Sequence, residues 1–275
     1  MSGVWFTIHL CLIKFLTDDY SAGSIAFMRA VIGTALISPI MFRSGLEILK
    51  LHQPGLVLLR GALGSLGFLL SFAAVASMPI SQFNAISFSR PLFVILMAAL
   101  LLGETVGPKR WAATAIGFLG VLIIVRPSTD MSMDSLMAIG SAMCFAGAIV
   151  LVKHLSKSHA TLTLLIYANI LTAIFTLPFA IADWKTPDAS ASVLIIAMAL
   201  SGTAAQASYI KGMSLGDASF VSGMDFLRLP MTVGADWFVF AMMPTIWVWP
   251  GAGLIIVSTL YITYRESKAQ SKPTQ

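Results

Sequence analysis

The sequence predicts an all-α polytopic membrane protein with ten transmembrane helices, arranged as two five-helix inverted repeats. The first observation is composition: of 275 residues, 57% are hydrophobic and only 11% are charged. A soluble domain carries roughly 25% charged residues, so this chain could not cover a water-exposed surface. The second is the length of the apolar stretches. Leu56–Ser77, Ser135–Val152 and Leu162–Ala182 approach or exceed the roughly 20 residues that cross a bilayer.

Clusters of Gly, Pro and charged residues divide the chain into helical segments. Helix is the expected element throughout, because backbone exposed to lipid must satisfy its own hydrogen bonds. The ten predicted spans cover residues 3–16, 24–41, 56–77, 80–102, 110–126, 135–154, 162–182, 191–211, 218–242 and 246–264. The first span is short, which indicates that it begins at the membrane surface or that the natural start lies upstream of Met1.

The basic residues orient these spans. With the N-terminus inside, eleven Lys and Arg residues fall on the cytoplasmic side and three on the other. The first set is Arg43, Lys50, Arg60, Lys109, Arg110, Lys153, Lys157, Lys211, Arg265, Lys268 and Lys272, and the second is Lys14, Arg126 and Lys185. Cytoplasmic loops of membrane proteins are enriched in Lys and Arg, so both termini are expected in the cytoplasm. The net charge of +5 is explained in this way, and nucleic-acid binding is not expected.

A shift of about 139 residues superimposes the two halves of the chain. Leu12-Ile13-Lys14 then falls on Leu151-Val152-Lys153, Arg90-Pro91 falls near Arg228-Leu229-Pro230, and Trp111 falls near Trp249. The predicted repeats are residues 1–127 and 135–265, followed by a disordered cytoplasmic tail at 266–275. Because each half holds five spans, an odd number, the halves have opposite orientations in the membrane. Inverted repeats of this kind place a substrate site near the midplane, where the halves meet.

Several stretches also match a known family. They are Arg29, Met78-Pro79-Ile80 through Pro91-Leu92-Phe93, Leu102-Gly103-Glu104, and Trp111 through Gly117-Phe118-Leu119-Gly120-Val121-Leu122 to Arg126-Pro127. With these residues the chain resembles, over nearly its whole length, the EamA-type members of the drug/metabolite transporter superfamily. The second half matches more loosely, with Ala241-Met242-Met243-Pro244 where a Gly-Glu pair is expected. The resemblance implies a bacterial inner-membrane carrier of amino acids, nucleosides or other small polar metabolites.

Five charged residues lie within the predicted spans: Arg29, Arg90, Asp225, Arg228 and Asp236. A charge at the centre of a membrane helix costs about 2.5–3.5 kcal/mol, so each is expected to face a cavity or a partner. Arg90 and Arg228 each lie about 15 Å deep, near the midplane. They are related by the repeat, and each lies next to or near a proline that kinks its helix. They are therefore the first candidates for substrate binding, and the alternative is that they only hold helices together.

The two aspartates are candidates for ion coupling, because a buried carboxylate can take up and release a proton. Asp225 and Arg228 are three residues apart and can pair on one helix face. Asp236 lies eleven residues after Asp225 and has no cation within one turn, so it is the preferred coupling residue. Its position near the outer end also allows a simpler interpretation, in which it is solvated.

Four further residues complete the predicted substrate site. Arg29 lies about a turn and a half inside its span, where it either lines a cavity or extends to the outer surface. Ser87 precedes Arg90 by one turn, and Gln206 and Tyr209 share a face of the eighth span. Three in-span arginines against two aspartates leave one cation unmatched. The ligand is therefore expected to carry an anionic or zwitterionic group, for which arginine offers a bidentate partner.

The sequence shows no phosphate loop, metal-ligand spacing or nucleophile with a nearby base, so we expect no cofactor, no bound metal and no catalytic residue. The predicted partners are a small-molecule substrate and membrane lipid, with protons as a candidate coupling ion. The predicted function is a secondary transporter that works by alternating access. The alternatives are a channel, a proton-independent facilitator or uptake carrier, and a membrane-embedded lipid-modifying enzyme.

Overall fold

Every secondary-structure element in the described part of the chain is an α-helix. The computed structural model describes residues 2–44, 50–102, 107–125, 132–155, 158–215 and 228–270. Its helices are α1 (Ser2–Thr17), α2 (Ala22–Ser44), α3 (Pro54–Ser77), α4 (Ile80–Ser87), α5 (Arg90–Leu102), α6 (Pro108–Val125), α7 (Met133–Leu155), α8 (Thr161–Ala182), α9 (Ala189–Leu215), α11 (Arg228–Phe240) and α12 (Val248–Gln270). The all-α prediction is confirmed for these residues.

Five helical stretches among the described residues are long and apolar enough to cross a membrane. They are Ala22–Pro39, Pro54–Ser77, Ile80–Met97, Met133–Val152 and Leu162–Ala182. Shorter apolar helices occupy the positions of the other predicted spans: Gly3–Thr17, Trp111–Ile124, Ala189–Ala205, Met231–Phe240 and Val248–Ile262. The last helix, α12, extends to Gln270, which is further into the predicted tail 266–275 than expected.

The span predicted as one helix over 80–102 is divided in two. The first part, α4, ends at Ser87, and α5 begins at Arg90. Pro91 has no N–H to donate and its ring clashes with the preceding turn, so the regular bonding pattern stops there. The N–H of Ser89 bonds instead to the carbonyl of Ile86 at 2.9 Å, which closes a tighter turn. The disturbance is expected next to Pro91, but the prediction of one kinked helix over 80–102 is wrong, because one helix ends at Ser87 and another begins at Arg90.

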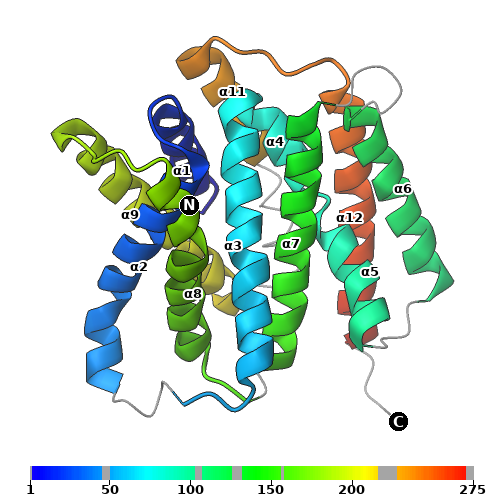
Figure 1. Ribbon diagram of the computed structural model, residues 1–275. Coiled ribbons are helices and arrows are strands. Elements are labelled where there is room, and N and C mark those ends of the chain that lie inside the picture. Colours follow the sequence, from blue (N-terminus) through cyan, green and yellow to red (C-terminus); the bar gives the residue numbers. More distant parts are fainter. Residues whose placement is uncertain are drawn as a thin grey trace.

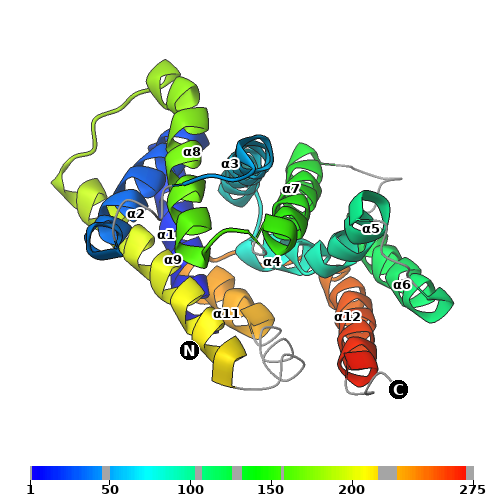
Figure 2. The ribbon, with the colours of Figure 1, turned by 90° about the horizontal axis from the view of Figure 1, so that it is seen from below.

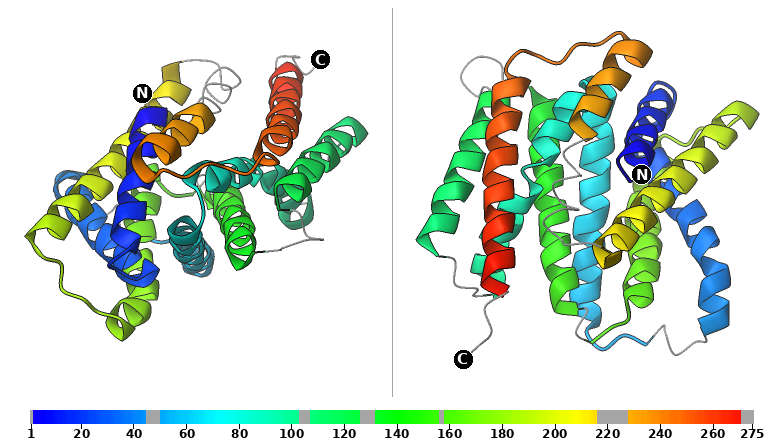
Figure 3. Two further views of the ribbon diagram at one scale, coloured as in Figure 1. Left: turned by 90° about the horizontal axis from the view of Figure 1, so that it is seen from above. Right: turned by 180° about the vertical axis from the view of Figure 1, so that it is seen from behind.

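Helices α3 and α7 lie side by side in the middle of the bundle (Figures 1 and 2). Helices α1, α2, α8 and α9 lie on one side of them, and α5, α6 and α12 lie on the other (Figure 2). The connection from α11 to α12 crosses one end of the bundle, as Figure 3 shows from behind. The strongest contacts join α3 to α7, α6 to α12, α2 to α8 and α1 to α9.

Carbonyl groups at the end of α3 and N–H groups at the start of α4 have no hydrogen-bond partner within their own helices. Lys14 of α1 is buried, and its Nζ donates to the carbonyl oxygens of Met78 at 2.7 Å and Val75 at 3.3 Å. The Asp236 carboxylate of α11 accepts hydrogen bonds from two N–H groups of α4, those of Ile80 at 2.8 Å and Ser81 at 2.6 Å. A cation at a helix C-terminus and an anion at an N-terminus are both favourable.

Close backbone approach fixes the α6–α12 pair. A Cβ atom added at Gly251 would lie 2.6 Å from the carbonyl oxygen of Gly120, and one added at Gly120 would lie 2.6 Å from that of Gly251. Both positions therefore require glycine, because backbone cannot move aside as a flexible side chain can. Gly253, two residues further along α12, is the matched comparison, since a Cβ atom added there would have no atom within 4 Å.

We expect Gly251→Ala to lower the thermal unfolding midpoint of the detergent-purified protein, because the added methyl group separates α6 from α12. Overpacking of this kind costs about 1–3 kcal/mol. Gly253→Ala is the matched control, and it should be neutral or stabilising by up to about 1 kcal/mol, since alanine is the better helix former. Equal unfolding midpoints for the two variants would show that a methyl group fits between α6 and α12 at Gly251.

We expect Asp236→Ala to destabilise the protein more than Asp236→Asn. Alanine leaves two buried N–H groups of α4 without an acceptor, at a cost of about 1–3 kcal/mol for each, whereas asparagine keeps one acceptor oxygen. Thermal unfolding monitored by intrinsic fluorescence would give the order wild type, Asn, Ala. An alanine variant as stable as wild type would contradict the capping role.

Candidate functional site

Arg29 of α2 lies inside the bundle, against a phenylalanine ring of α3. Its Cζ atom is 4.3 Å from the ring centroid of Phe68, which is within cation–π range. The Nε atom of Arg29 is buried and has no hydrogen-bond partner. This position corresponds to the interior alternative of the sequence analysis, and not to extension towards the outer surface.

His9 of α1 belongs to the same region. It is buried, and it interacts electrostatically with Arg29. Its Nδ1 atom lies 2.9 Å from the carbonyl oxygen of Met198 in α9. If Nδ1 carries the proton, it donates to that carbonyl. The contact also ties α1 to α9.

Arg90 occupies an equivalent position on the other side of α3 and α7. It is the first residue of α5, and its Cζ atom lies 4.8 Å from the ring centroid of Phe145 in α7. The rings of Phe68 and Phe145 contact each other edge to face, with centroids 5.1 Å apart and planes at 77°. Two arginines therefore flank one aromatic pair, and we call Arg29, Phe68, Phe145 and Arg90 the arginine–phenylalanine array.

A glycine of α3, Gly67, leaves room for the ring of Phe145 in this array. A Cβ atom at Gly67 would lie 3.0 Å from Cε1 of the Phe145 ring, so a larger residue would push the ring away. Because Gly67 precedes Phe68 in the chain, the ring of Phe145 reaches the backbone of α3 beside the residue that it contacts. The close packing of α3 on α7 thus sets the geometry between the two arginines.

A second polar region lies between α4 and α11. Besides the bonds from Ile80 and Ser81 to Asp236, the side-chain amide of Asn84 donates to the hydroxyl of Thr232 at 3.3 Å. Asp236 is fully buried, and it interacts electrostatically with Lys14. Asp236 has no cation within one turn of its own helix, as the sequence indicates, but two backbone N–H groups of α4 bond to it, so the solvated alternative is wrong. The partners come from elements far away in the sequence, which spacing within one helix cannot show.

The other predicted site residues are placed only in part. Ser87 is the half-buried last residue of α4. Arg228 begins α11, and Gln206 and Tyr209 lie in α9, but their side chains are outside the described residues. Asp225 is outside the described residues altogether. The structure thus brings Arg29 and Arg90 to one array. It places Asp236 in the polar region between α4 and α11, which we call the seam.

Several residues of these regions are not among the sequence-based candidates, and Phe68, Phe145 and Lys14 make the most informative contacts. Phe68 and Phe145 are two of 17 phenylalanines, and nothing in their spacing distinguishes them. Lys14 counts with the outer loops in the sequence pattern because it closes the first span. The sequence does contain a signal for Lys14. It lies four residues before Asp18, and therefore still within the helix α1 rather than in the loop that follows it.

Both halves of the chain match one protein family. The model of the EamA-like transporter family matches residues 1–126 and again residues 133–264. A solved crystal structure that is 16% identical covers 98% of each chain with a TM-score of 0.60, and it shares the fold.

The chain is also similar to curated bacterial transporters. A riboflavin transporter of Vibrio cholerae is 34% identical over 97% of this chain and 92% of its own length. An S-adenosylmethionine uptake transporter of Rickettsia felis is 29% identical over 98% and 94%. A pseudopaline exporter of Pseudomonas aeruginosa is 26% identical over 94% and 92%.

These similarities, together with the apolar helices, make the protein a multi-pass inner-membrane transporter of small metabolites. They overturn the alternative of a lipid-modifying enzyme, because the family is one of transporters. The chain belongs to the EamA-like transporter family.

Proposed function

We propose that this protein is a secondary transporter that moves a small polar metabolite across the inner membrane by alternating access. The observation that carries the proposal is the arginine–phenylalanine array in the middle of the bundle. Arginine inside a membrane protein is costly unless it faces a partner or a water-filled path. Arg29 and Arg90 are both half-buried, so they are still partly accessible. Arg228, Ser87, Gln206 and Tyr209 complete the proposed substrate site.

The proposed mechanism requires two halves, residues 1–127 and 135–265, that move relative to each other. The pattern of helix packing supports this division. Contacts of α3 with α7 are matched by those of α9 with α1, and contacts of α5 with α7 by those of α11 with α1. If each predicted span is exchanged with the span five positions along the chain, α3–α7 becomes α9–α1, and α5–α7 becomes α11–α1. The pairs α2–α8 and α6–α12 are their own counterparts.

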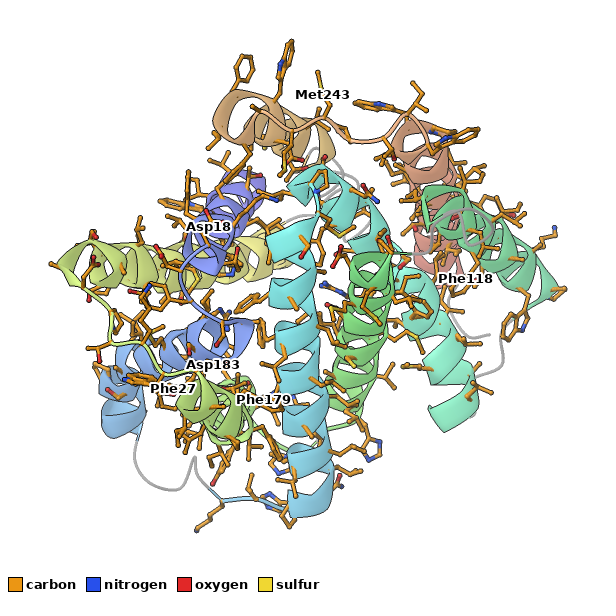
Figure 4. The ribbon with its side chains drawn as sticks, turned by 45° about the horizontal axis from the view of Figure 1, so that its top comes forward. Asp18, Phe27, Phe118, Phe179, Asp183 and Met243 are labelled. Carbon is orange, nitrogen blue, oxygen red and sulfur yellow. The ribbon has the colours of Figure 1, made fainter. Side chains whose placement is uncertain are left out.

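The proposed orientation has both termini in the cytoplasm. The ends of α2, α5, α7 and α12, which lead into basic segments of the chain, lie at the same end of the bundle as the C-terminus (Figure 1). Acidic residues gather at the other end, where Asp18 and Asp183 are labelled in Figure 4. Asp19 pairs there with Lys185 at 3.3 Å. This asymmetry is the one expected when the basic end faces the cytoplasm.

Asp236 remains the proposed coupling residue, with a role that its contacts define. Its two oxygens hold the first N–H groups of α4, which faces α11 across the seam. Protonation would remove the negative charge that strengthens these bonds. Proton uptake at Asp236 would therefore loosen α4 from α11, and Asp225 is kept as the second candidate.

Flux into liposomes tests the function. We expect the reconstituted protein to transport labelled riboflavin or S-adenosylmethionine, the compounds named for its relatives, or an amino acid or nucleoside, with flux increased by a pH gradient. Asp236→Asn should keep exchange and lose the stimulation by the gradient, because the amide cannot carry the proton. Wild-type flux without any effect of the gradient would identify a proton-independent facilitator, and no flux of any compound would overturn the proposal.

Neutralising Arg90 or Arg228 should lower flux about tenfold or more, since a charge-assisted hydrogen bond contributes about 1.5–3 kcal/mol. The measurement is initial flux in liposomes that contain equal amounts of inserted Arg90→Gln, Arg228→Gln or wild-type protein. Lys185→Gln is the control, because Lys185 is exposed and pairs only at the surface. Undiminished flux in both arginine variants would show that these residues are structural.

A further inference from the structure

We propose that the arginine–phenylalanine array binds a planar ring system, uncharged or anionic, with hydrogen-bond acceptors along its edge. The inference rests on the proposed function and names the substrate class of the same site. The array contributes side chains from α2, α3, α7 and α5, so it includes elements of both predicted halves.

The groups of the array are flat, and they already make the contacts that a ring would make. Each guanidinium lies over a phenyl ring, at 4.3 Å for Arg29 and 4.8 Å for Arg90. Aromatic rings and guanidinium planes are the surfaces on which planar heterocycles stack. A ring that enters beside Phe68 or Phe145 replaces one stacked partner by another, so neither phenyl face is left exposed.

Arg29 also has a donor to offer. Its Nε is buried and unpaired, and it makes no ion pair with any carboxylate in the described part of the chain. A buried donor without an acceptor is costly, and an oxygen or nitrogen at the edge of a heterocycle would satisfy it. All four residues of the array are half-buried, whereas the Nε atom of Arg29 is fully buried, so a ligand that binds this atom has to displace a neighbouring side chain.

The charge of the array restricts the ligand further. Arg29 makes no ion pair with a carboxylate of the described residues, and the fully buried Asp236 is bound to the backbone of α4 in the separate seam. A permanently cationic ligand would be repelled by like charges in a medium of low dielectric. A neutral or anionic ring is favoured over a ring that carries a sulfonium group. The array therefore favours flavin-like compounds over S-adenosylmethionine.

Ligand binding to the detergent-purified protein tests this inference. The probes are riboflavin, lumichrome (the ring without its sugar-alcohol chain), ribitol (the chain without the ring) and S-adenosylmethionine. We expect riboflavin and lumichrome to raise the thermal midpoint in proportion to ligand concentration over Kd, ribitol to have no effect, and S-adenosylmethionine to bind more weakly than riboflavin. Stabilisation by ribitol and not by lumichrome would overturn the inference, and so would tighter binding of S-adenosylmethionine than of riboflavin.

Variants connect the binding to the array. Phe68→Leu and Phe145→Leu keep an apolar side chain and remove the stacking surface, so each should weaken riboflavin binding about tenfold. Phe118→Leu is the matched control: Phe118 is half-buried on α6, and its ring contacts Phe93 edge to face at 4.9 Å (Figure 4). No cationic group of a described residue lies over that pair. Equal affinities in all three variants would overturn the inference.

Arg29→Lys covers the case in which a phenylalanine variant does not fold. This variant keeps the charge and removes the planar guanidinium group. It should weaken lumichrome binding. Without ligand, its thermal unfolding midpoint should stay close to that of Phe118→Leu. Lumichrome binding equal to that of wild type would contradict the role of Arg29.

Failure of the inference and failure of the proposed function are distinguishable. Binding of the ring without flux in liposomes would refute transport and support the array as a binding site. Flux of another metabolite without binding of any ring compound would refute the inference and support transport.

Discussion

The break in the chain between α3 and α4 imposes the constraint on which the rest of the bundle depends. At Met78-Pro79 the polypeptide turns inside an apolar molecule, where unsatisfied N–H and carbonyl groups each cost several kcal/mol. Lys14 from α1 satisfies the end of α3, and Asp236 from α11 satisfies the start of α4. The first predicted span is therefore bound to the end of the third, and the ninth is bound to the start of the fourth. Any motion of α4 relative to α11 has to break or replace the bonds to Asp236.

The arginine–phenylalanine array solves a different problem, that of keeping cations within a membrane. Arg29 and Arg90 each lie over a ring, and the two rings contact each other at the junction of α3 and α7. A cation over a ring is stabilised without a counter-charge, so the guanidinium group of Arg29 can be held there without a carboxylate of the described residues. The seam and the array separate two tasks: Asp236 holds backbone, and the arginines face the centre.

The named compounds of two relatives, riboflavin and S-adenosylmethionine, both contain a planar nitrogen-rich ring system. The relatives differ in what they are named for, which is expected if a common helical scaffold is adapted by a few side chains near its centre. In this chain, the array combines side chains of α2, α3 and α5 with one of α7, which contacts both α3 and α5 (Figure 2).

Composition and local backbone chemistry are sufficient to predict the class of protein, the helical structure of the described residues, the positions of the apolar segments and the place of the disturbance next to Pro91. Each residue carries these properties with it, whatever its neighbours in space. The cost of a charge in an apolar span likewise identifies Arg29, Arg90 and Asp236 from the sequence. Their partners, which are Phe68, Phe145 and the N-terminus of α4, become visible only when the helices are packed together. The physical reason is that lipid is as apolar as the protein interior. A membrane helix that is apolar on all sides therefore carries no periodic signal for the face it turns towards a neighbour.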